Sequence, residues 1–140
     1  MFEPDELLLA LGEGDVRFII IGGVAVGVHG YVRATTDLDI VPDPETWNLT
    51  RLAAVLRALR AEHVGLGDFS ADEFPYDPTD PLQWVAGIDE DPAYSALARE
   101  AITVRFRDGE VRVCGLDHLR AMKQAAGRDQ DLNDLRELAG

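Results

Sequence analysis

One stretch, residues 18–41, constrains the fold of this chain more than any other part of the sequence. It opens with the apolar run Phe18–Ile21, which predicts a buried β-strand. Gly22 and Gly23 follow at once, and a short helix of small residues is expected to begin there. A polar loop then leads to a second predicted strand, residues 37–41. The stretch therefore predicts two neighbouring strands with a glycine turn and a short helix between them.

Two acidic residues, Asp37 and Asp39, alternate along the second predicted strand, so their side chains are expected to share one face. Neighbouring carboxylates repel each other unless a cation lies between them. Carboxylate oxygens suit Mg²⁺, which keeps several waters and takes one or two protein carboxylates plus substrate phosphates. A Gly-Gly turn at the start of a helix can offer backbone N–H groups to an anion. The pattern predicts a site for a nucleoside triphosphate with its metal.

A purely structural interpretation of the same residues stays open. Gly22 and Gly23 would then make only a tight turn, and the two aspartates would cap a solvated strand end. Other phosphate-binding motifs do not fit, because the glycines at 22, 23 and 27 do not form G-x-G-x-x-G. A P-loop is also excluded, since no Lys-Ser or Lys-Thr pair follows the glycines.

The ordered combination of residues resembles a known signature. It is similar to that of the nucleotidyltransferase superfamily that includes DNA polymerase β, and in particular of its small bacterial toxin-like members of the AbiEii type. Their pattern is Gly-Gly or Gly-Ser, a spacer, and then Arg-x-Thr-x-Asp-x-Asp. The residues that match it here are Gly22, Gly23, Arg33, Thr35, Asp37 and Asp39.

The resemblance implies a fold and an activity. The implied fold is a single nucleotidyltransferase-like domain over residues 1–140, of the α/β (α+β) class, with a mixed β-sheet flanked by helices and with C-terminal helices. The implied activity is transfer of a nucleotidyl group from an NTP–Mg²⁺ (or Mn²⁺) complex to a hydroxyl on RNA, including tRNA, on a protein or on a small molecule. A toxin-like role would add a cognate antitoxin as partner.

The resemblance also implies roles for individual residues. Asp37 and Asp39 would hold the metal, and the Gly22 and Gly23 amides would hold the phosphates. Arg33 would offset phosphate charge, and Thr35 would orient the loop that precedes the two aspartates.

The C-terminal stretch Lys123–Asp134 adds to the resemblance, since it is similar to Lys-x-Ala-x-x-Arg-x-x-Asp-x-x-Asp of the toxin-like members. By that resemblance Lys123 contacts the triphosphate and acts as a catalytic residue with the two aspartates, because a cation stabilises charge in phosphoryl transfer. Arg128 and Asp131 would join the two helices or help to bind the nucleotide. The alternative is an ordinary amphipathic helix pair in which Arg128 and Asp131 form an ion pair at i,i+3.

Enzymes of the resembled superfamily usually carry a third carboxylate on a later strand. The aligned position here is Gln83, an amide that cannot act as a base. Asp80 or Asp89 could supply the missing oxygen if the register shifts. A second hypothesis is therefore a catalytically weakened module that binds nucleotide or acts as a toxin–antitoxin partner.

Composition and charge restrict the expected binding surfaces and the expected cellular compartment. The net charge of −13 argues against a broad, non-specific nucleic-acid surface. The apolar runs are too short to span a bilayer, and the N-terminus is acidic where a secretory signal needs a basic region. The one cysteine, Cys114, is expected to be a buried small hydrophobe in a reducing compartment, so we expect a cytoplasmic protein.

The three histidines do not pair at metal-ligand spacing with one another or with Cys114, which argues against a zinc site. His29 either lines the cleft or is a partly buried residue with its hydrogen bonds satisfied.

Hydrophobic periodicity and turn residues predict the remaining elements. Helices are expected at residues 5–12, 45–62, 92–101, 116–126 and 130–139, a loop at 63–81, and strands at 82–86, 102–106 and 110–114. Asp108-Gly109 is expected to form the turn between the last two strands.

Overall fold

The computed structural model of the 140-residue chain describes residues 4–35, 37–59 and 94–139. The loop at 63–81 and the strand at 82–86 lie outside the described residues. The same holds for Asp80, Gln83 and Asp89, so the predictions that concern them stay predictions.

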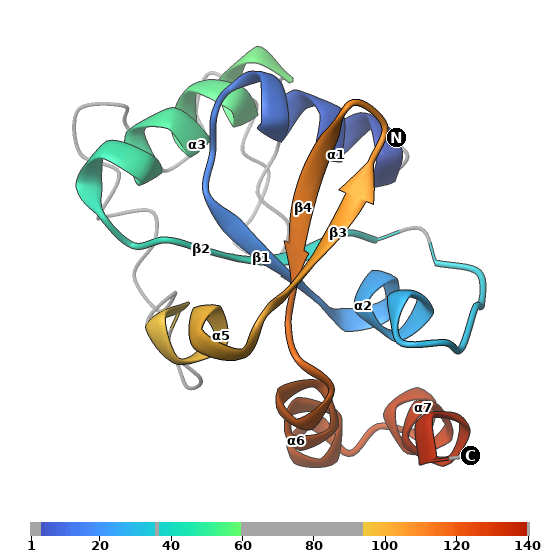
Figure 1. The fold of residues 1–140 in the computed structure, drawn as a ribbon. Helices are drawn as coiled ribbons and strands as arrows, with labels where there is room; N and C mark the ends of the chain where they lie inside the picture. Colours follow the sequence, from blue (N-terminus) through green and yellow to red (C-terminus); the bar gives the residue numbers. More distant parts are fainter. Residues whose placement is uncertain (1–3, 36, 60–93, 140) are drawn as a thin grey trace, which may run out of the picture.

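The described strands form one mixed sheet in the order β2-β1-β4-β3 (Figure 1). Its members are β1 (Phe18–Ile21), β2 (Asp39–Pro42), β3 (Ile102–Phe106) and β4 (Gly109–Val113). β1 pairs antiparallel with β2 and parallel with β4, and β3 and β4 form an antiparallel hairpin. The predicted mixed sheet is therefore present.

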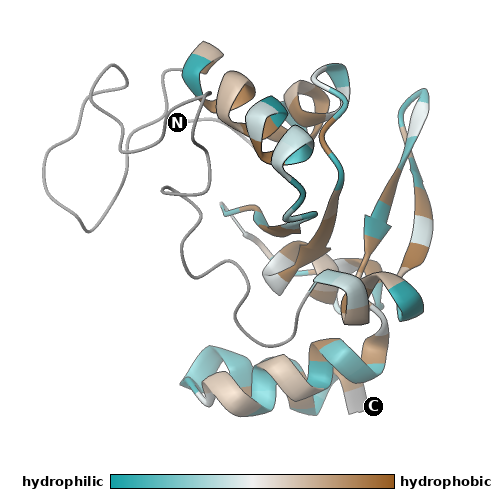
Figure 2. Ribbon diagram, turned by 90° about the vertical axis from the view of Figure 1, so that its left-hand side faces the viewer, coloured by the Kyte–Doolittle hydropathy of each residue, from teal (hydrophilic) through white to brown (hydrophobic). Residues whose placement is uncertain are grey.

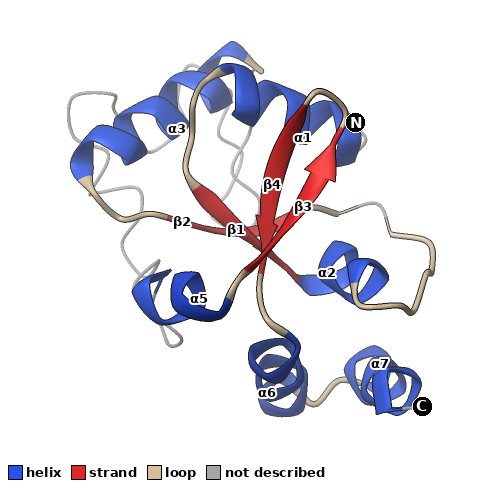
Figure 3. Cartoon of the chain, viewed as in Figure 1, coloured by secondary structure: helices blue, strands red, loops and turns tan. Residues whose placement is uncertain are grey.

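Six helices surround this sheet in the described part of the chain. They are α1 (Pro4–Glu13), α2 (Gly22–Val28), α3 (Thr46–Ala58), α5 (Tyr94–Glu100), α6 (Leu116–Ala126) and α7 (Asp129–Ala139). α1 and α3 lie at one end of the molecule and α6 and α7 at the opposite end (Figure 3). The fold is α+β, with helices flanking the sheet and two C-terminal helices, as predicted. Among the described helices, none is both long and apolar enough to cross a membrane.

The core forms around β1, whose residues Phe18, Ile19 and Ile20 are buried. Leu49 and Leu52 pack there from the predicted apolar stripe of α3, and Leu119 packs from α6. In Figure 2 the strands in the middle of the molecule are largely brown, while teal gathers on the surrounding helices and turns. The buried strand fixes the position of the residue that follows it, Gly22, at the first turn of α2.

Several predicted boundaries differ from those of the structure, and two of the differences follow from strand pairing. β2 begins at Asp39 and not at Asp37. The last residue of β1, Ile21, pairs with Asp39, and the residue after Ile21, Gly22, already belongs to α2. The turn of the β3–β4 hairpin is formed by Arg107 and Asp108, since Gly109 pairs with Phe106 as the first residue of β4. Arg107 adopts the left-handed φ of 53° that this tight turn needs.

The start of β1 is joined to the end of β2 by Asn48, a fully buried residue of α3. Its side-chain amide donates to the carbonyl oxygens of Arg17 (2.8 Å) and Asp43 (2.9 Å). Its carbonyl oxygen accepts from the backbone N–H of Arg17 at 2.7 Å. The Arg17 carbonyl oxygen also accepts from the backbone N–H of Asp43, at 3.0 Å. Asn48 adds three bonds to backbone groups at these strand ends, so it helps to hold together the two strands that carry the glycine turn and Asp39.

We expect Asn48→Ala to lower the free energy of unfolding by about 2 kcal/mol or more, because buried backbone groups lose their partner. Gln124→Ala is the matched control, since Gln124 is exposed on α6 and a surface substitution should change stability by only about 0.5 kcal/mol. Urea unfolding of both variants measures the difference. Equal stabilities would show that Asn48 does not hold the strand pair.

Candidate functional site

An open cleft of about 760 Å³ lies where the end of β1, the start of α2, the segment before β2 and the helices α6 and α7 meet. Among the described residues, each one that the sequence assigns to the nucleotide or metal site lines this cleft. These are Gly22, Gly23, Arg33, Thr35, Asp37, Asp39, Lys123 and Arg128. The structure thus brings together residues from the two ends of the chain that are predicted to act at one site.

The two glycines make room for the polar groups of the cleft. Gly22 has a φ of 71°, a left-handed conformation that favours glycine, and a Cβ atom there would meet the carboxylate of Asp39. A Cβ atom on Gly23 would lie 3.0 Å from the hydroxyl oxygen of Thr35 and 3.2 Å from a guanidinium nitrogen of Arg33. The close approach of this turn to Asp39, Thr35 and Arg33 therefore depends on the absence of side chains.

The two carboxylates of the predicted metal site are exposed. Pairing with Ile21 places Asp39 at the start of β2. Asp37 lies before the strand. The backbone N–H of Asp37 donates to the Thr35 hydroxyl oxygen at 3.4 Å, and the Thr35 hydroxyl donates to the Asp37 carbonyl oxygen at 3.3 Å. These two bonds join Thr35 to the backbone of Asp37. In the part of the chain that the structure describes, neither carboxylate makes a hydrogen bond or an ion pair.

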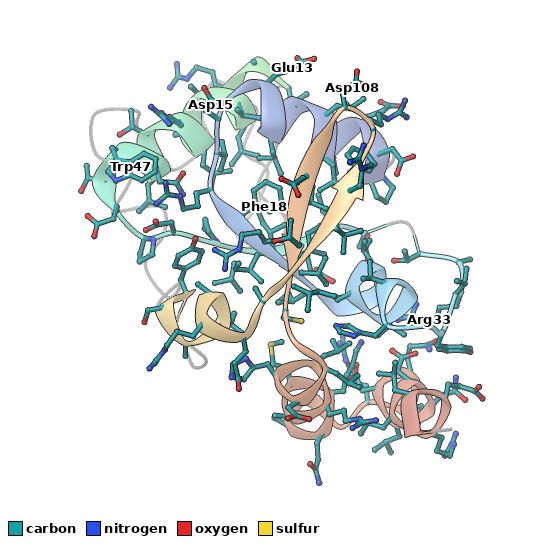
Figure 4. The ribbon with its side chains drawn as sticks, in the orientation of Figure 1. Glu13, Asp15, Phe18, Arg33, Trp47 and Asp108 are labelled. Carbon is teal, nitrogen blue, oxygen red and sulfur yellow. The ribbon has the colours of Figure 1, made fainter. Side chains whose placement is uncertain are left out.

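The cations of the cleft are paired with carboxylates of α7. Arg33 donates from Nε and Nη2 to the two oxygens of Asp134, at 2.9 and 3.0 Å. Lys123 lies between Asp134 (2.9 Å) and Asp131 (3.2 Å). Figure 4 shows Arg33 beside α7. The loop that follows α2 is therefore joined to the C-terminal helices by ionic contacts.

Arg128 completes this group, which we call the ion network (Arg33, Lys123, Arg128, Asp131 and Asp134). Its Nε donates to Asp131 at 2.7 Å, so the ion pair expected at i,i+3 is present. The Arg128 side chain is 76% exposed, whereas the Asp131 and Asp134 side chains are at most 1% exposed. The network therefore has buried anions and one largely exposed cation.

Both buried carboxyl groups are held in their ionised form. The hydrogen bond from Arg128 lowers the pKa of Asp131 to about 2, against the effect of burial and with help from Lys123. Burial raises the pKa of Asp134, but hydrogen bonds from Arg33, Lys123 and Gln130 outweigh it and leave that pKa below its usual value.

The sequence did not assign a role to Asp134 or Gln130. Asp134 appears only as the last residue of the C-terminal motif, although its spacing from Asp131 places both on one face of a helix. This shared helix face is the sequence feature that could have indicated a role for Asp134 beside Asp131. The partner of Asp134 is Arg33, so far away in the sequence that no local pattern could reveal the contact.

His29 and Cys114 do not line the cleft. The Nε2 atom of His29 donates to the Cys114 carbonyl oxygen at 2.7 Å, so His29 is a partly buried residue with a satisfied hydrogen bond. Cys114 is fully buried, and burial raises the pKa of its thiol to about 11, as expected for a small core residue.

The donor set for a metal consists of two carboxylates in the described part of the chain. Among those residues, no group of three or more His, Cys, Asp or Glu side chains could hold a metal ion. Asp37 and Asp39 remain, both exposed, unpaired and lining the same cleft. This set fits Mg²⁺ that takes its other ligands from water and substrate phosphates.

Gly22→Ala and Gly27→Ala should change stability in opposite directions. Gly22→Ala should cost about 1–2 kcal/mol for the left-handed conformation alone, and the displacement of Asp39 should add to this. Gly27 lies in the same helix with open space beside it, so Gly27→Ala should stabilise by about 0.5–1 kcal/mol. Urea unfolding tests the pair, and equal effects at both positions would contradict the described turn.

Acid should weaken the ion network. The pKa of Asp131 is lower in the folded state than its value of 3.8 in the unfolded state. Asp131 therefore stabilises the fold fully at pH values above 3.8, and this contribution is lost as the pH falls towards about 2. Asp131→Asn and Arg128→Gln should both flatten the decline of the free energy of unfolding over this interval. Denaturant unfolding at a series of pH values measures the slope, and slopes equal to wild type would disprove the assignment.

Comparison with known proteins gives no match to any protein-family model or to any curated protein. The functional argument therefore rests on the cleft itself. Its described chemistry consists of two carboxylates without an ion pair, a glycine turn and three cations, each paired with a buried aspartate.

Proposed function

We propose that the protein is a metal-dependent nucleotidyltransferase of the polymerase β-like superfamily, which binds a nucleoside triphosphate with Mg²⁺ or Mn²⁺ in the cleft. The observation that carries the proposal is the convergence of residues. Eight positions that the resemblance assigns to the nucleotide and metal site line one cleft. If the glycines made only a tight turn and the aspartates only capped a strand end, Lys123 and Arg128 would not need to line the same cleft as Asp37 and Asp39.

The charge of the cleft supports binding of nucleotide together with its metal. Four carboxylates and three cations line or border it, so its net charge is negative without a metal. A triphosphate alone would be repelled by Asp37 and Asp39. A divalent ion held by these two residues would neutralise both the carboxylates and the phosphate oxygens. Nucleotide and metal are therefore expected to bind together.

The chain's own residues have distinct tasks in the proposed transfer. Gly22 and Gly23 let the phosphates approach the backbone, and Arg33 and Lys123 offset their charge. In the reaction, the acceptor hydroxyl oxygen forms a bond to the α-phosphorus while the bond from that phosphorus to the leaving oxygen breaks. Pyrophosphate leaves, and the hydroxyl proton passes to a base.

We propose a cytoplasmic setting, a hydroxyl on RNA, tRNA, a protein or a small molecule as acceptor, and a cognate antitoxin as partner. The chain's net charge of −13 favours an acceptor recognised at the cleft over one held along a broad basic surface.

One observation favours the second hypothesis, a module that binds nucleotide without efficient transfer. In the part of the chain that the structure describes, the cleft offers two carboxylates without a cation partner, Asp37 and Asp39. The position that the resemblance gives to the third carboxylate is Gln83, an amide. Loss of a general base typically costs about 10²–10⁴-fold in rate.

Calorimetry with Mg²⁺ and each of the four nucleoside triphosphates tests the proposed site. The double variant Asp37→Asn, Asp39→Asn should lose metal and nucleotide binding. Without metal it should be no less stable than wild type, because two mutually repelling charges are gone. The control variant Asp108→Asn, Glu110→Gln removes the same charge from the β3–β4 hairpin and should bind as wild type does. Equal binding by wild type and the Asp37, Asp39 variant would overturn the proposal.

Incorporation of labelled nucleotides into total RNA, protein and small-molecule fractions separates the two hypotheses. Transfer by wild type that is lost in Asp37→Ala supports the enzyme. Binding without transfer, followed by a gain of transfer in Gln83→Glu, supports the weakened module.

A further inference from the structure

Asp134 receives more hydrogen bonds than either carboxylate of the predicted metal site. It is fully buried in α7 and accepts from Arg33 twice, from Lys123 and from Gln130, all at 2.9 to 3.0 Å. A buried carboxylate is costly unless it is paired in this way. Asp134 does not itself line the cleft, although Arg33, Lys123 and Gln130 all do. Any effect it has on a bound ligand must therefore pass through those neighbours.

We propose that Asp134 is a positioning residue, which fixes Arg33 and Lys123 in the orientation that receives the triphosphate. The proposal rests on the proposed function, since it takes the triphosphate as the ligand of the cleft. Arg33 comes from the loop after α2 and Lys123 from α6, so the two cations belong to segments that are far apart in the sequence. Asp134 is bonded to both and so fixes the spacing between them.

Both cations keep donors for a ligand after pairing with carboxylates. An arginine has five N–H groups, of which Arg33 uses two for Asp134 and one for the Ala34 carbonyl oxygen. A lysine has three, of which Lys123 uses one each for Asp134 and Asp131. The Arg33 and Lys123 side chains are only 19% and 8% exposed, so the clamped cations are held close to the protein.

Clamping has an energetic consequence for binding. Free arginine and lysine side chains lose rotamer freedom when a ligand orders them, and this loss weakens binding. In this cleft α7 has already ordered both side chains before any phosphate arrives. The charge of Asp134 acts in the opposite direction, because it competes with phosphate for the same cations. Because Asp134 is fully buried, salt screens this charge effect only weakly, and we expect the effect of orientation to outweigh it.

Asp131 does not share this task to the same extent. It lines the cleft itself and is bonded mainly to Arg128, whose side chain is largely exposed. Its link to Lys123 is longer than that of Asp134, at 3.2 Å against 2.9 Å. Among the carboxylates of the ion network, Asp134 is the one bonded to both Arg33 and Lys123.

Binding of Mg²⁺ with inorganic triphosphate, a probe that has no base, tests the proposal. Asp134→Asn should weaken binding by about tenfold, which corresponds to about 1.4 kcal/mol. In a Lys123→Gln background the same substitution should weaken binding clearly less than about tenfold, because one of the two cations through which Asp134 acts is gone and only Arg33 remains. Glu137→Gln, an exposed position on the same helix, is the matched control and should bind as wild type does.

A measurement on wild type covers the case in which Asp134→Asn does not fold. The Arg33 Nε–H group should be as rigid as the backbone by ¹⁵N relaxation without ligand, and it should stay so when Mg²⁺ and triphosphate are added. An Arg33 side chain that is mobile until the triphosphate binds would overturn the proposal. So would equal losses of affinity on Asp134→Asn in the wild-type and Lys123→Gln backgrounds.

The outcomes separate this proposal from the proposed function. Absence of triphosphate binding by wild type overturns both. Binding by wild type that is lost with Asp37→Asn and Asp39→Asn, but is unchanged by Asp134→Asn, overturns the role of Asp134 alone.

Discussion

The ion network on α7 is the interaction on which the cleft depends. Two buried carboxylates, Asp131 and Asp134, would be costly in the interior of the protein without Lys123 and the two arginines. Conversely, the cations would be mobile surface side chains without α7. The packing of the C-terminal helices and the arrangement of the cleft are therefore parts of one electrostatic arrangement, and neither can be changed without affecting the other.

The opposite wall depends on a different constraint, namely the close approach of backbone to side chain at Gly22. Burial of β1 fixes where the strand ends, and the left-handed turn at Gly22 leaves the space that the Asp39 carboxylate occupies. Asp39 in turn is placed by its pairing with Ile21. The burial of β1, the register of the β1–β2 pair and the turn at Gly22 together place Asp39 in the cleft, near Asp37 and the cations of the ion network.

Much of this could be predicted from local sequence. The apolar run at Phe18–Ile21, the periodic leucines of α3 and the Gly127 stop after α6 all predict elements that the structure contains, because each pattern reflects burial or backbone geometry within a few residues. Phosphate and metal chemistry favours the glycine turn and the pair Asp37 and Asp39, whereas the resemblance supplied the other site residues.

Contacts between distant parts of the chain could not be predicted. The bond from Arg33 to Asp134 depends on how the sheet and C-terminal helices pack, and no local pattern encodes it. The start of β2 was misplaced for a related reason, because strand length is set by the partner strand and not by the alternation Asp37-Leu38-Asp39 alone.

The most direct test of the account is a crystal structure with Mn²⁺ and a non-hydrolysable nucleoside triphosphate. The account predicts an anomalous Mn²⁺ peak bonded to Asp37 and Asp39. It also predicts that the phosphates lie against Gly22 and Gly23 and within reach of Lys123. A nucleotide bound elsewhere, or a metal that avoids both aspartates, would contradict it.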